Sequence, residues 1–278
     1  MPREPGYGAG CRIALVSSRQ DPAGRNIGGC VRDLLDQGPG IGYPDHGYRF
    51  IPLEVEERLI WQDGFDRQLP ADLICFLSRH SSERPSPVLT THVTGNFRTA
   101  AFGGIPGSLP PAAPAFMHAV LAELAVFAPP GYRVSYEVTH HGPTELHIPS
   151  LFVEIGSNPA EWGDPDAGMA VARSVLSAAP AGDEIPLVGF GGTHYARRET
   201  EIALGSRGAF GHMVHSRELP FLTGEQVALM GDRTCAVAAY IDKKAVPAAD
   251  FTRVDRLIAG AGLVRLSEGD ITGMGGLS

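Results

Sequence analysis

Short apolar runs bounded by glycine, proline and polar residues recur along the whole chain. Runs of this length and composition are typical of strands in the interior of a sheet, where both faces are covered. They predict strands at residues 11–18, 48–55, 71–78, 88–93, 133–138, 151–157, 185–192 and 236–241, and a weaker strand within residues 203–214.

Between these runs, apolar residues recur every three or four positions, as they do on one face of a helix. Ile27, Val31 and Leu34 show this spacing shortly after Asp21 and Pro22, which are residues that favour the start of a helix. The same kind of pattern predicts helices at residues 26–37, 113–127, 159–178, 224–230 and 250–259.

Strands that alternate with helices, without a long linker, predict an α/β fold. We expect a mixed, mostly parallel sheet with helices on both faces, in a single domain that covers residues 1–278. A connector rich in glycine and proline at residues 103–114 is the alternative boundary between two subdomains. Candidate functional residues lie on both sides of this connector, which favours one domain.

Composition and charge narrow the class of protein. Of the 278 residues, 43% are hydrophobic, which is enough for a sizeable core, and no stretch approaches the ~20 apolar residues that span a bilayer. We therefore expect a cytoplasmic protein that does not contact a membrane.

The cysteines and the net charge limit the chemistry further. The four cysteines lack the spacing of a thiolate zinc site, and we expect them to be reduced. A net charge of −8 argues against a protein that coats nucleic acid, but it leaves room for a local basic rim.

Four of the ten histidines lie just beyond predicted strands. His80 follows the strand at residues 71–78, His140 and His141 follow the strand at 133–138, and His194 follows the strand at 185–192. In an open α/β sheet, ligands bind in the crevice beyond the carboxyl ends of the strands, because loops from several strands converge there. Imidazoles from three strands therefore predict a metal site or an acid/base site in this crevice.

Residues 139–157 hold the densest cluster of candidate metal ligands. His140, His141 and His147 supply imidazole nitrogens, and Glu154 supplies a carboxylate from the next predicted strand. This is the ligand set that zinc prefers in open catalytic sites.

The adjacent pair His140 and His141 poses a geometric question. Neighbouring side chains on a regular strand point to opposite faces, so the two share a site only if the turn at Gly142 and Pro143 breaks the β geometry. In the alternative, one histidine lies in the site while the other packs or caps elsewhere.

A glycine-rich segment at residues 189–195 ends in His194 and Tyr195. Glycine lets the backbone approach a ligand closely, and exposed backbone N–H groups can hold an oxyanion or a phosphate. The glycine spacing does not match the dinucleotide-binding fingerprint. The chain also lacks the G-x-S-x-G, H-E-x-x-H and Walker A motifs, which argues against a serine α/β-hydrolase, the commonest zincins and P-loop NTPases.

Two further histidine segments complete the set. His80 and His92 flank a hydroxyl-rich stretch, and they can meet at one metal or act separately as a base and a substrate anchor. The alternative for His92 is a core histidine with its hydrogen bonds satisfied. His212 lies in a later Gly-His-Met segment.

Five segments, in this order, resemble the archaeal-type D-aminoacyl-tRNA deacylases, a family that also has plant members. The segments are SRHSS at residues 78–82, PVLTTHVTGN at 87–96, THHGPT at 139–144, FVEIGS at 152–157 and GFGGTHYARR at 189–198. Arg197 stands where we would expect proline after GGTHYA, a departure that alters only the following turn.

The resemblance implies a zinc-dependent hydrolase that cleaves the ester between a D-amino acid and the 3′-terminal adenosine of tRNA. It also implies an α/β fold similar to phosphorylases and peptidyl-tRNA hydrolases, and activity without an obligate protein partner. Such a reaction needs an activated water and a place for the tetrahedral oxyanion, and zinc serves both needs.

On this hypothesis each candidate residue has a role. We assign catalysis to His80, His141 and His194, and metal binding to His140, His141, Glu154 and His194. His80 and His92 are further candidates for ligand or general base, and the N–H groups of Gly191 and Gly192 for the oxyanion site. We assign substrate binding to His92, Asn96, Arg98, Gly191, Gly192, Thr193, Tyr195 and His212. The candidates for stacking on the terminal adenine of the D-aminoacyl-tRNA, and for the positive charge around it, are Phe97, Arg98, Tyr195 and Arg197.

Two other functions fit the residues taken alone. One is a phosphorylase- or peptidase-like enzyme on a related α/β scaffold, in which the glycine-rich segment holds phosphate or a peptide carbonyl. The other is a non-catalytic protein whose histidines hold a structural metal, as in closed sites with four protein ligands.

Overall fold

The computed structural model describes residues 6–82 and 85–274. Residues 1–5, 83–84 and 275–278 of the expected single domain lie outside the described residues. The strands are β1 (Arg12–Ser18), β2 (Arg49–Val55), β3 (Leu73–Arg79), β4 (Val88–His92), β5 (Arg133–Tyr136), β6 (Ser150–Gly156), β7 (Ile185–Phe190), β8 (Gly208–Val214), β9 (Ala238–Ile241) and β10 (Val264–Leu266).

Helices and short 3₁₀ turns connect these strands. The helices are α1 (Pro22–Gln37), α2 (Pro114–Phe127), α3 (Pro159–Trp162), α4 (Pro165–Ser177), α5 (Arg197–Leu204), α6 (Gly224–Thr234), α7 (Ala248–Gly260) and α8 (Glu268–Gly273). The 3₁₀ turns are η1 (Leu59–Trp61), η2 (Phe65–Gln68) and η3 (Leu219–Phe221).

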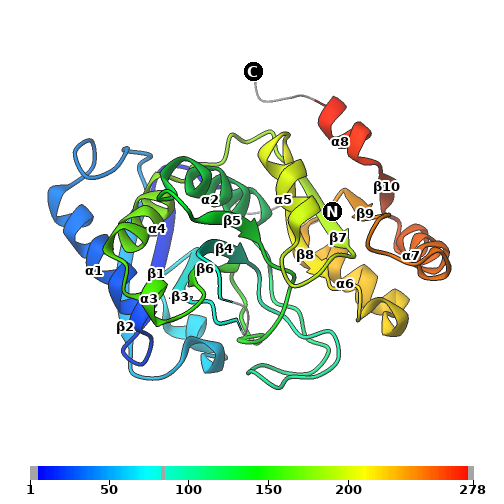
Figure 1. Ribbon diagram of the computed structural model, residues 1–278, viewed down its shortest axis with the longest axis horizontal. Helices are drawn as coiled ribbons and strands as arrows, with labels where there is room; N and C mark the ends of the chain where they lie inside the picture. The colour runs from blue at the N-terminus through cyan, green and yellow to red at the C-terminus, as the bar shows by residue number, and fades with distance from the viewer. Residues whose placement is uncertain (1–5, 83–84, 275–278) are drawn as a thin grey trace.

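The predicted α/β class is confirmed, but the strands form two sheets rather than one (Figure 1). The larger sheet has the order β2-β1-β3-β6-β4-β5, and only the β4–β6 pair within it is antiparallel. The smaller sheet, β10-β9-β7-β8, is wholly parallel. Most neighbouring strands are therefore parallel, as expected.

The two sheets are covered in different ways. Helices α1, α2 and α4 pack on one face of the larger sheet, and the other face packs against η1, η2 and the segment before β6. The smaller sheet has helices on both faces, with α6 and α7 on one side and α2 and α5 on the other. The face of the larger sheet opposite α1, α2 and α4 is thus the one that short turns and loops cover, and it carries the site described below.

The largest apolar cluster contains side chains from both sheets. That continuity agrees with one domain, although the single-domain expectation stays a prediction. Cys11, Cys30 and Cys75 are free thiols, as expected. Among the helices of the described residues, none is both long enough and apolar enough to cross a bilayer.

The predicted elements differ from the structure in a few places. The helix expected at residues 159–178 is two helices, because Asp164 caps α4 by accepting a hydrogen bond from the backbone N–H of Asp166, and Pro165 then starts a new helix. Helices α5 and α8 and strand β10 were not predicted. In α5, a buried glutamate, Glu199, interrupts the apolar spacing that would mark a helix.

Candidate functional site

Polar side chains line the face of the larger sheet that lies opposite α1, α2 and α4. Ser78 on β3, His92 on β4 and Glu154 on β6 alternate with residues such as Leu77 and Val153, which pack toward the helices. Since side chains alternate between the two faces of a strand, this spacing directs the polar groups to one side. In register, Ser78 and Thr90 both pair with Glu154, which places these side chains next to one another.

A buried carboxylate, Glu137, lies at the centre of the site. It follows β5, and its Oε1 is 3.0 Å from His80 Nδ1, while its Oε2 is 2.8 Å from His194 Nε2 and 3.4 Å from His140 Nε2. Glu137 was not predicted as a site residue. The available signal was a glutamate between Tyr136 and Val138 at the end of a predicted strand, three residues before His140.

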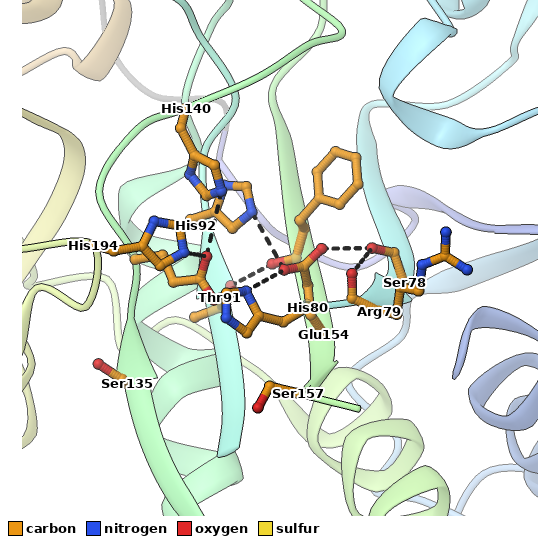
Figure 2. Close-up of polar contacts among 12 residues, drawn as sticks. Ser78, Arg79, His80, Thr91, His92, Ser135, His140, Glu154, Ser157 and His194 are labelled. Atoms are coloured by element: carbon orange, nitrogen blue, oxygen red, sulfur yellow. Dashed lines mark hydrogen bonds and ion pairs between the residues drawn. The ribbon is translucent and has the colours of Figure 1, made fainter. Parts of the chain in front are cut away.

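The second buried carboxylate, Glu154, joins the same cluster from β6. Ser78 Oγ donates a hydrogen bond to its Oε1 at 2.5 Å, and its Oε2 lies 3.8 Å from His80 Nδ1 and 3.7 Å from His92 Nε2. Figure 2 shows His80, His92 and Glu154 turned toward one another beside His140 and His194.

The turn after β5 brings both adjacent histidines into the site. His141 has a left-handed φ of 47°, and its ring centroid lies 4.4 Å from that of His140 and 4.9 Å from that of His92. The departure from β geometry that shared use of the pair required is therefore present, and the alternative of one histidine packed elsewhere is wrong.

Backbone carbonyls fix the ring orientation of three of these histidines. His92 Nδ1 donates to the carbonyl of Val93, His140 Nδ1 to that of Val138, and His141 Nδ1 to that of Gly142, at 3.0, 2.7 and 2.7 Å. A carbonyl only accepts, so each ring carries its proton on Nδ1 and keeps a lone pair on Nε2. Metal-binding histidines are oriented by hydrogen bonds of this kind.

The electrostatics separate the groups into charged and neutral members. Burial alone would raise the pKa of Glu137, but the adjacent His194 and His80 hold that pKa well below its usual range. Burial lowers the pKa of His141 to about 4, with His92 adding to the effect, and it also lowers the pKa of His140. At neutral pH, His140 and His141 are thus neutral imidazoles beside an ionised carboxylate.

Burial by itself would lower the pKa values of His80 and His92, yet both pKa values are raised. Glu137 has this effect on His80, and Glu154 has it on His92. Each carboxylate therefore stabilises positive charge on the imidazole beside it.

Two clefts meet at the histidines. The first has a volume of about 610 Å³, and the second about 550 Å³. Both are lined by Phe102, His140, His141 and His194. A molecule bound across the histidines can therefore extend in both directions.

The predicted crevice at the carboxyl ends of strands is only part of the site. The first cleft does lie there, since Asp21 follows β1, Ser81 follows β3 and Trp162 follows β6. Strand β5, however, runs antiparallel to β3, so its carboxyl end points to the opposite edge of the sheet. His140 and His141 reach the site across the sheet face instead.

Several predicted substrate-binding residues have structural partners instead. The N–H of Gly191 donates to the carbonyl of Val214 at 2.9 Å, so it is not available to an oxyanion. His212 is fully buried, and its nitrogens contact the carbonyl of Pro110 and the hydroxyl of Thr139. Gly191, Gly192, Thr193 and His212 line neither cleft.

Of the remaining candidates, Asn96 and Arg98 line the second cleft. Asn96 also ties a loop by donating to the carbonyl of Gly103, and Arg98 pairs with Glu218. The hydroxyl of Tyr195 is hydrogen-bonded to His80 Nε2 at 3.1 Å and thereby supports the cluster from behind.

The other residues named for the adenine differ in position. Phe97 lines the second cleft but is largely buried in the smaller apolar cluster. Arg197 lines neither cleft, is 89% exposed and pairs with Glu201. His147, a further ligand candidate, is an exposed side chain beside Asp66.

The nitrogen and oxygen atoms of the cluster are better placed to bind a metal than to form hydrogen bonds with one another. Although the His80 and His194 nitrogens approach Glu137 closely, neither Glu137 oxygen accepts a hydrogen bond of correct geometry from a described residue. The described residues form three groups of potential ligands with atoms within 4.8 Å of one another: His92, His140 and His141; His80, Glu137 and His194; and His92, Glu137 and Glu154. The first two groups share no residue, so the cluster can hold two ions. The four expected ligands, His140, His141, Glu154 and His194, are divided among these groups.

The fold and the site define an α/β protein whose functional centre is a buried carboxylate surrounded by imidazoles. The sequence profile of the family described as D-aminoacyl-tRNA deacylase matches residues 67–265. The chain belongs to this family.

Two relatives named D-aminoacyl-tRNA deacylase show the extent of the similarity. The protein of Methanoculleus marisnigri is 53% identical over 268 residues, which cover 96% of this chain and 61% of the relative. That of Methanosarcina mazei is 38% identical over 279 residues, covering 94% of this chain and 93% of the relative. This chain thus spans about three fifths of the first relative and nearly all of the second.

A solved structure has the same fold. The crystal structure of a conserved protein of unknown function superposes with a TM-score of 0.85 at 34% identity, covering 98% of this chain and all of that one. The specific likeness to phosphorylases and peptidyl-tRNA hydrolases stays a prediction.

Proposed function

We propose that this protein hydrolyses the ester that joins a D-amino acid to the 3′-terminal adenosine of tRNA, releasing the free amino acid and the tRNA. The observation that carries the proposal is the convergence of five histidines on Glu137 and Glu154 where two clefts meet. Membership of the deacylase family supports the reaction and the substrate. Charged tRNA is a cytoplasmic substrate, and we place the protein there.

We propose zinc as the bound metal. The donor set of imidazoles and carboxylates is the one that zinc prefers. His80, Glu137 and His194 would hold one ion, and His92, His140 and His141 a second. Bound at this site, zinc would lower the pKa of a water and polarise the ester carbonyl.

The residues of the chain would prepare the site for that chemistry. His140 and His141 stay neutral at pH 7, and their Nε2 lone pairs face the cluster. Ser78 holds Glu154 in place through its 2.5 Å hydrogen bond, and Tyr195 fixes the ring of His80. The ester would lie between the two clefts, beside His194.

The test compares D-tyrosyl-tRNA with L-tyrosyl-tRNA, with and without a chelator and with zinc added back. The proposal expects fast release of tyrosine from the D form, loss of this activity with chelator and recovery with zinc. Equal rates for both forms, or phosphate-dependent nucleoside cleavage, would contradict the substrate assignment. Bound zinc without turnover would leave only a structural metal site.

A further inference from the structure

Two large aromatic side chains lie exposed beside the clefts. Phe102 is 63% exposed and lines both clefts, and Trp61, at the end of η1, is 52% exposed next to Ile60 of the first cleft. Exposed apolar side chains beside a cleft are candidates for a ligand-binding surface.

The backbones that carry these rings are packed tightly against the histidine turn. A Cβ added to Gly103 would lie 1.8 Å from the carbonyl oxygen of Ile60, and one added to Gly142 would lie 2.6 Å from the same oxygen. The N–H of Gly142 also donates to the carbonyl of Phe102 at 2.9 Å. The backbone segments that carry Trp61 and Phe102 are therefore held close to the turn that carries His141.

Two arginines lie near the rings without neutralising partners. Arg58 lines the first cleft and Arg217 the second, and both are exposed. Neither guanidinium has an ion-pair or hydrogen-bond partner in the part of the chain that the structure describes. In a protein with a net charge of −8, unpaired cations at both clefts favour an anionic ligand.

We propose that Trp61 and Phe102 stack the bases of the single-stranded 3′ end of tRNA, while Arg58 and Arg217 contact its phosphates. This inference rests on the proposed function and names the residues that recognise the nucleic acid. Phe102 stacks the terminal adenine, because it lines the clefts that contain the reacting ester. Trp61 lies outside both clefts and stacks the preceding nucleotide.

Stacking with nearby cations is how proteins hold single strands without reading a duplex. A protein partner would also cover exposed rings, but it would not require unpaired arginines at both clefts. The surface therefore replaces Arg197, which lines neither cleft, as a candidate contact for the tRNA end.

The experiment measures binding apart from chemistry. An uncharged acceptor-stem minihelix with a single-stranded 3′ end is titrated into the full chain, and its affinity is read by fluorescence anisotropy. Phe102→Ala and Trp61→Ala should each weaken binding about 10-fold, since a stacked base contributes about 1–3 kcal/mol. Trp61→Phe should stay within about 3-fold of the unsubstituted protein because it keeps a ring.

A second arm separates the two rings. With D-tyrosyl-adenosine as substrate, Phe102→Ala should raise KM about 10-fold and Trp61→Ala should leave KM unchanged, because this substrate lacks the preceding nucleotide.

The arginines are tested through salt. Arg58→Ala and Arg217→Ala should each make the slope of log affinity against log salt concentration shallower, by the amount that corresponds to the loss of about one phosphate contact. Matched controls are Val126→Ala and Arg256→Ala, which change an exposed apolar side chain and an exposed arginine that line neither cleft.

The outcomes distinguish this inference from the proposed function. If the minihelix binds and both ring variants bind like the controls, stacking by these rings is wrong, whatever the activity. If the unsubstituted protein does not bind the minihelix, the surface belongs to another partner. If binding falls as expected but no D-aminoacyl ester is hydrolysed, the proposed function fails and the nucleic-acid contact stands.

Discussion

Glu137 and Glu199 are both fully buried near the connection between β7 and α5, but the groups that surround their carboxylates differ. Glu137 has imidazole nitrogens within 3.4 Å on three histidines. Glu199 has neither oxygen hydrogen-bonded to a described residue, and it lies near Gly189 of β7 and Gly192 of the connection. The same residue type thus meets two opposite environments, one beside the His194 ring and the other in the helix that follows His194.

The difference shows that burial alone does not set the charge of a carboxylate. When two carboxylates are equally buried, the groups beside each one decide whether it is ionised. Burial raises the pKa of Glu199 to about 8, so this side chain is largely protonated at pH 7. His194 and His80 keep the pKa of Glu137 below its usual range in spite of the same burial. Burying an ionised carboxylate costs free energy, and a cation beside the carboxylate offsets that cost. This contrast favours Glu137 over Glu199 as a participant in the proposed reaction.

The largest expected effect separates the two glutamates by activity. Glu137→Gln keeps the shape of the side chain and removes its charge, so kcat/KM for D-tyrosyl-tRNA should fall about 10³-fold or more, because loss of an outer metal partner alone costs about 10–100-fold. Glu199→Gln is the matched control and should retain activity within about 3-fold. Steady-state deacylation with the metal content of each variant checks both.

Comparable losses in the two variants would break the comparison. Such a result would mean that the buried carboxyl of Glu199 also acts on the reaction, through the glycine-rich connection that leads to His194.

The second effect tests zinc through stability. A metal that binds only the folded protein should stabilise it by about 2.7 kcal/mol when zinc is at 100 times its Kd. Thermal unfolding of the chelator-treated protein, with and without zinc, should show a rise in Tm that Glu199→Gln keeps and that Glu137→Gln reduces, because the second proposed ion, at His92, His140 and His141, does not need Glu137. An equal rise in both variants would place the ion elsewhere.

The sequence analysis reached much of the fold and part of the site. Strands such as β1 and β3 were predictable because their apolar runs are continuous, and His80, His92, His140, His141 and His194 were found from their place after or within strands. The two-sheet arrangement could not be read from local patterns, because strand pairing depends on contacts between residues far apart in the chain. Glu137 was missed because burial of a charged residue depends on partners that only the fold brings together.

His212 was assigned to the substrate for a related reason. A histidine at the end of a strand has the same local pattern whether it faces a cleft or the carbonyl of Pro110. Gly191 is similar, since its positive φ of 113° and its contact with Val246 explain the glycine without a ligand.

The third effect concerns the pH dependence of stability. The pKa of Glu199 is raised in the folded protein, so its contribution to stability is intact below its unfolded pKa and is lost as pH rises toward about 8. Glu199→Gln should therefore raise the free energy of unfolding by about 4 kcal/mol at pH 8 and by much less at pH 4. Urea unfolding at the two pH values measures the difference, and a gain that is equal at both would show that the pKa of Glu199 is not raised in the folded protein.

The smallest expected effect concerns His147 and Asp66, a histidine–carboxylate pair that lies outside the cluster and can be compared with the pairs that Glu137 forms. His147 Nδ1 lies 3.4 Å from Asp66 Oδ2, but the imidazole is 65% exposed, while the carboxylate is buried and also accepts from the backbone N–H groups of His147 and Ile148. An exposed imidazole adds little to such a pair, so His147→Gln should change the free energy of unfolding by less than about 0.5 kcal/mol and leave kcat unchanged. Urea unfolding and deacylation assays check this. A loss of activity like that expected for Glu137→Gln would place His147 in the site and show that exposure does not separate the functional histidines from the rest.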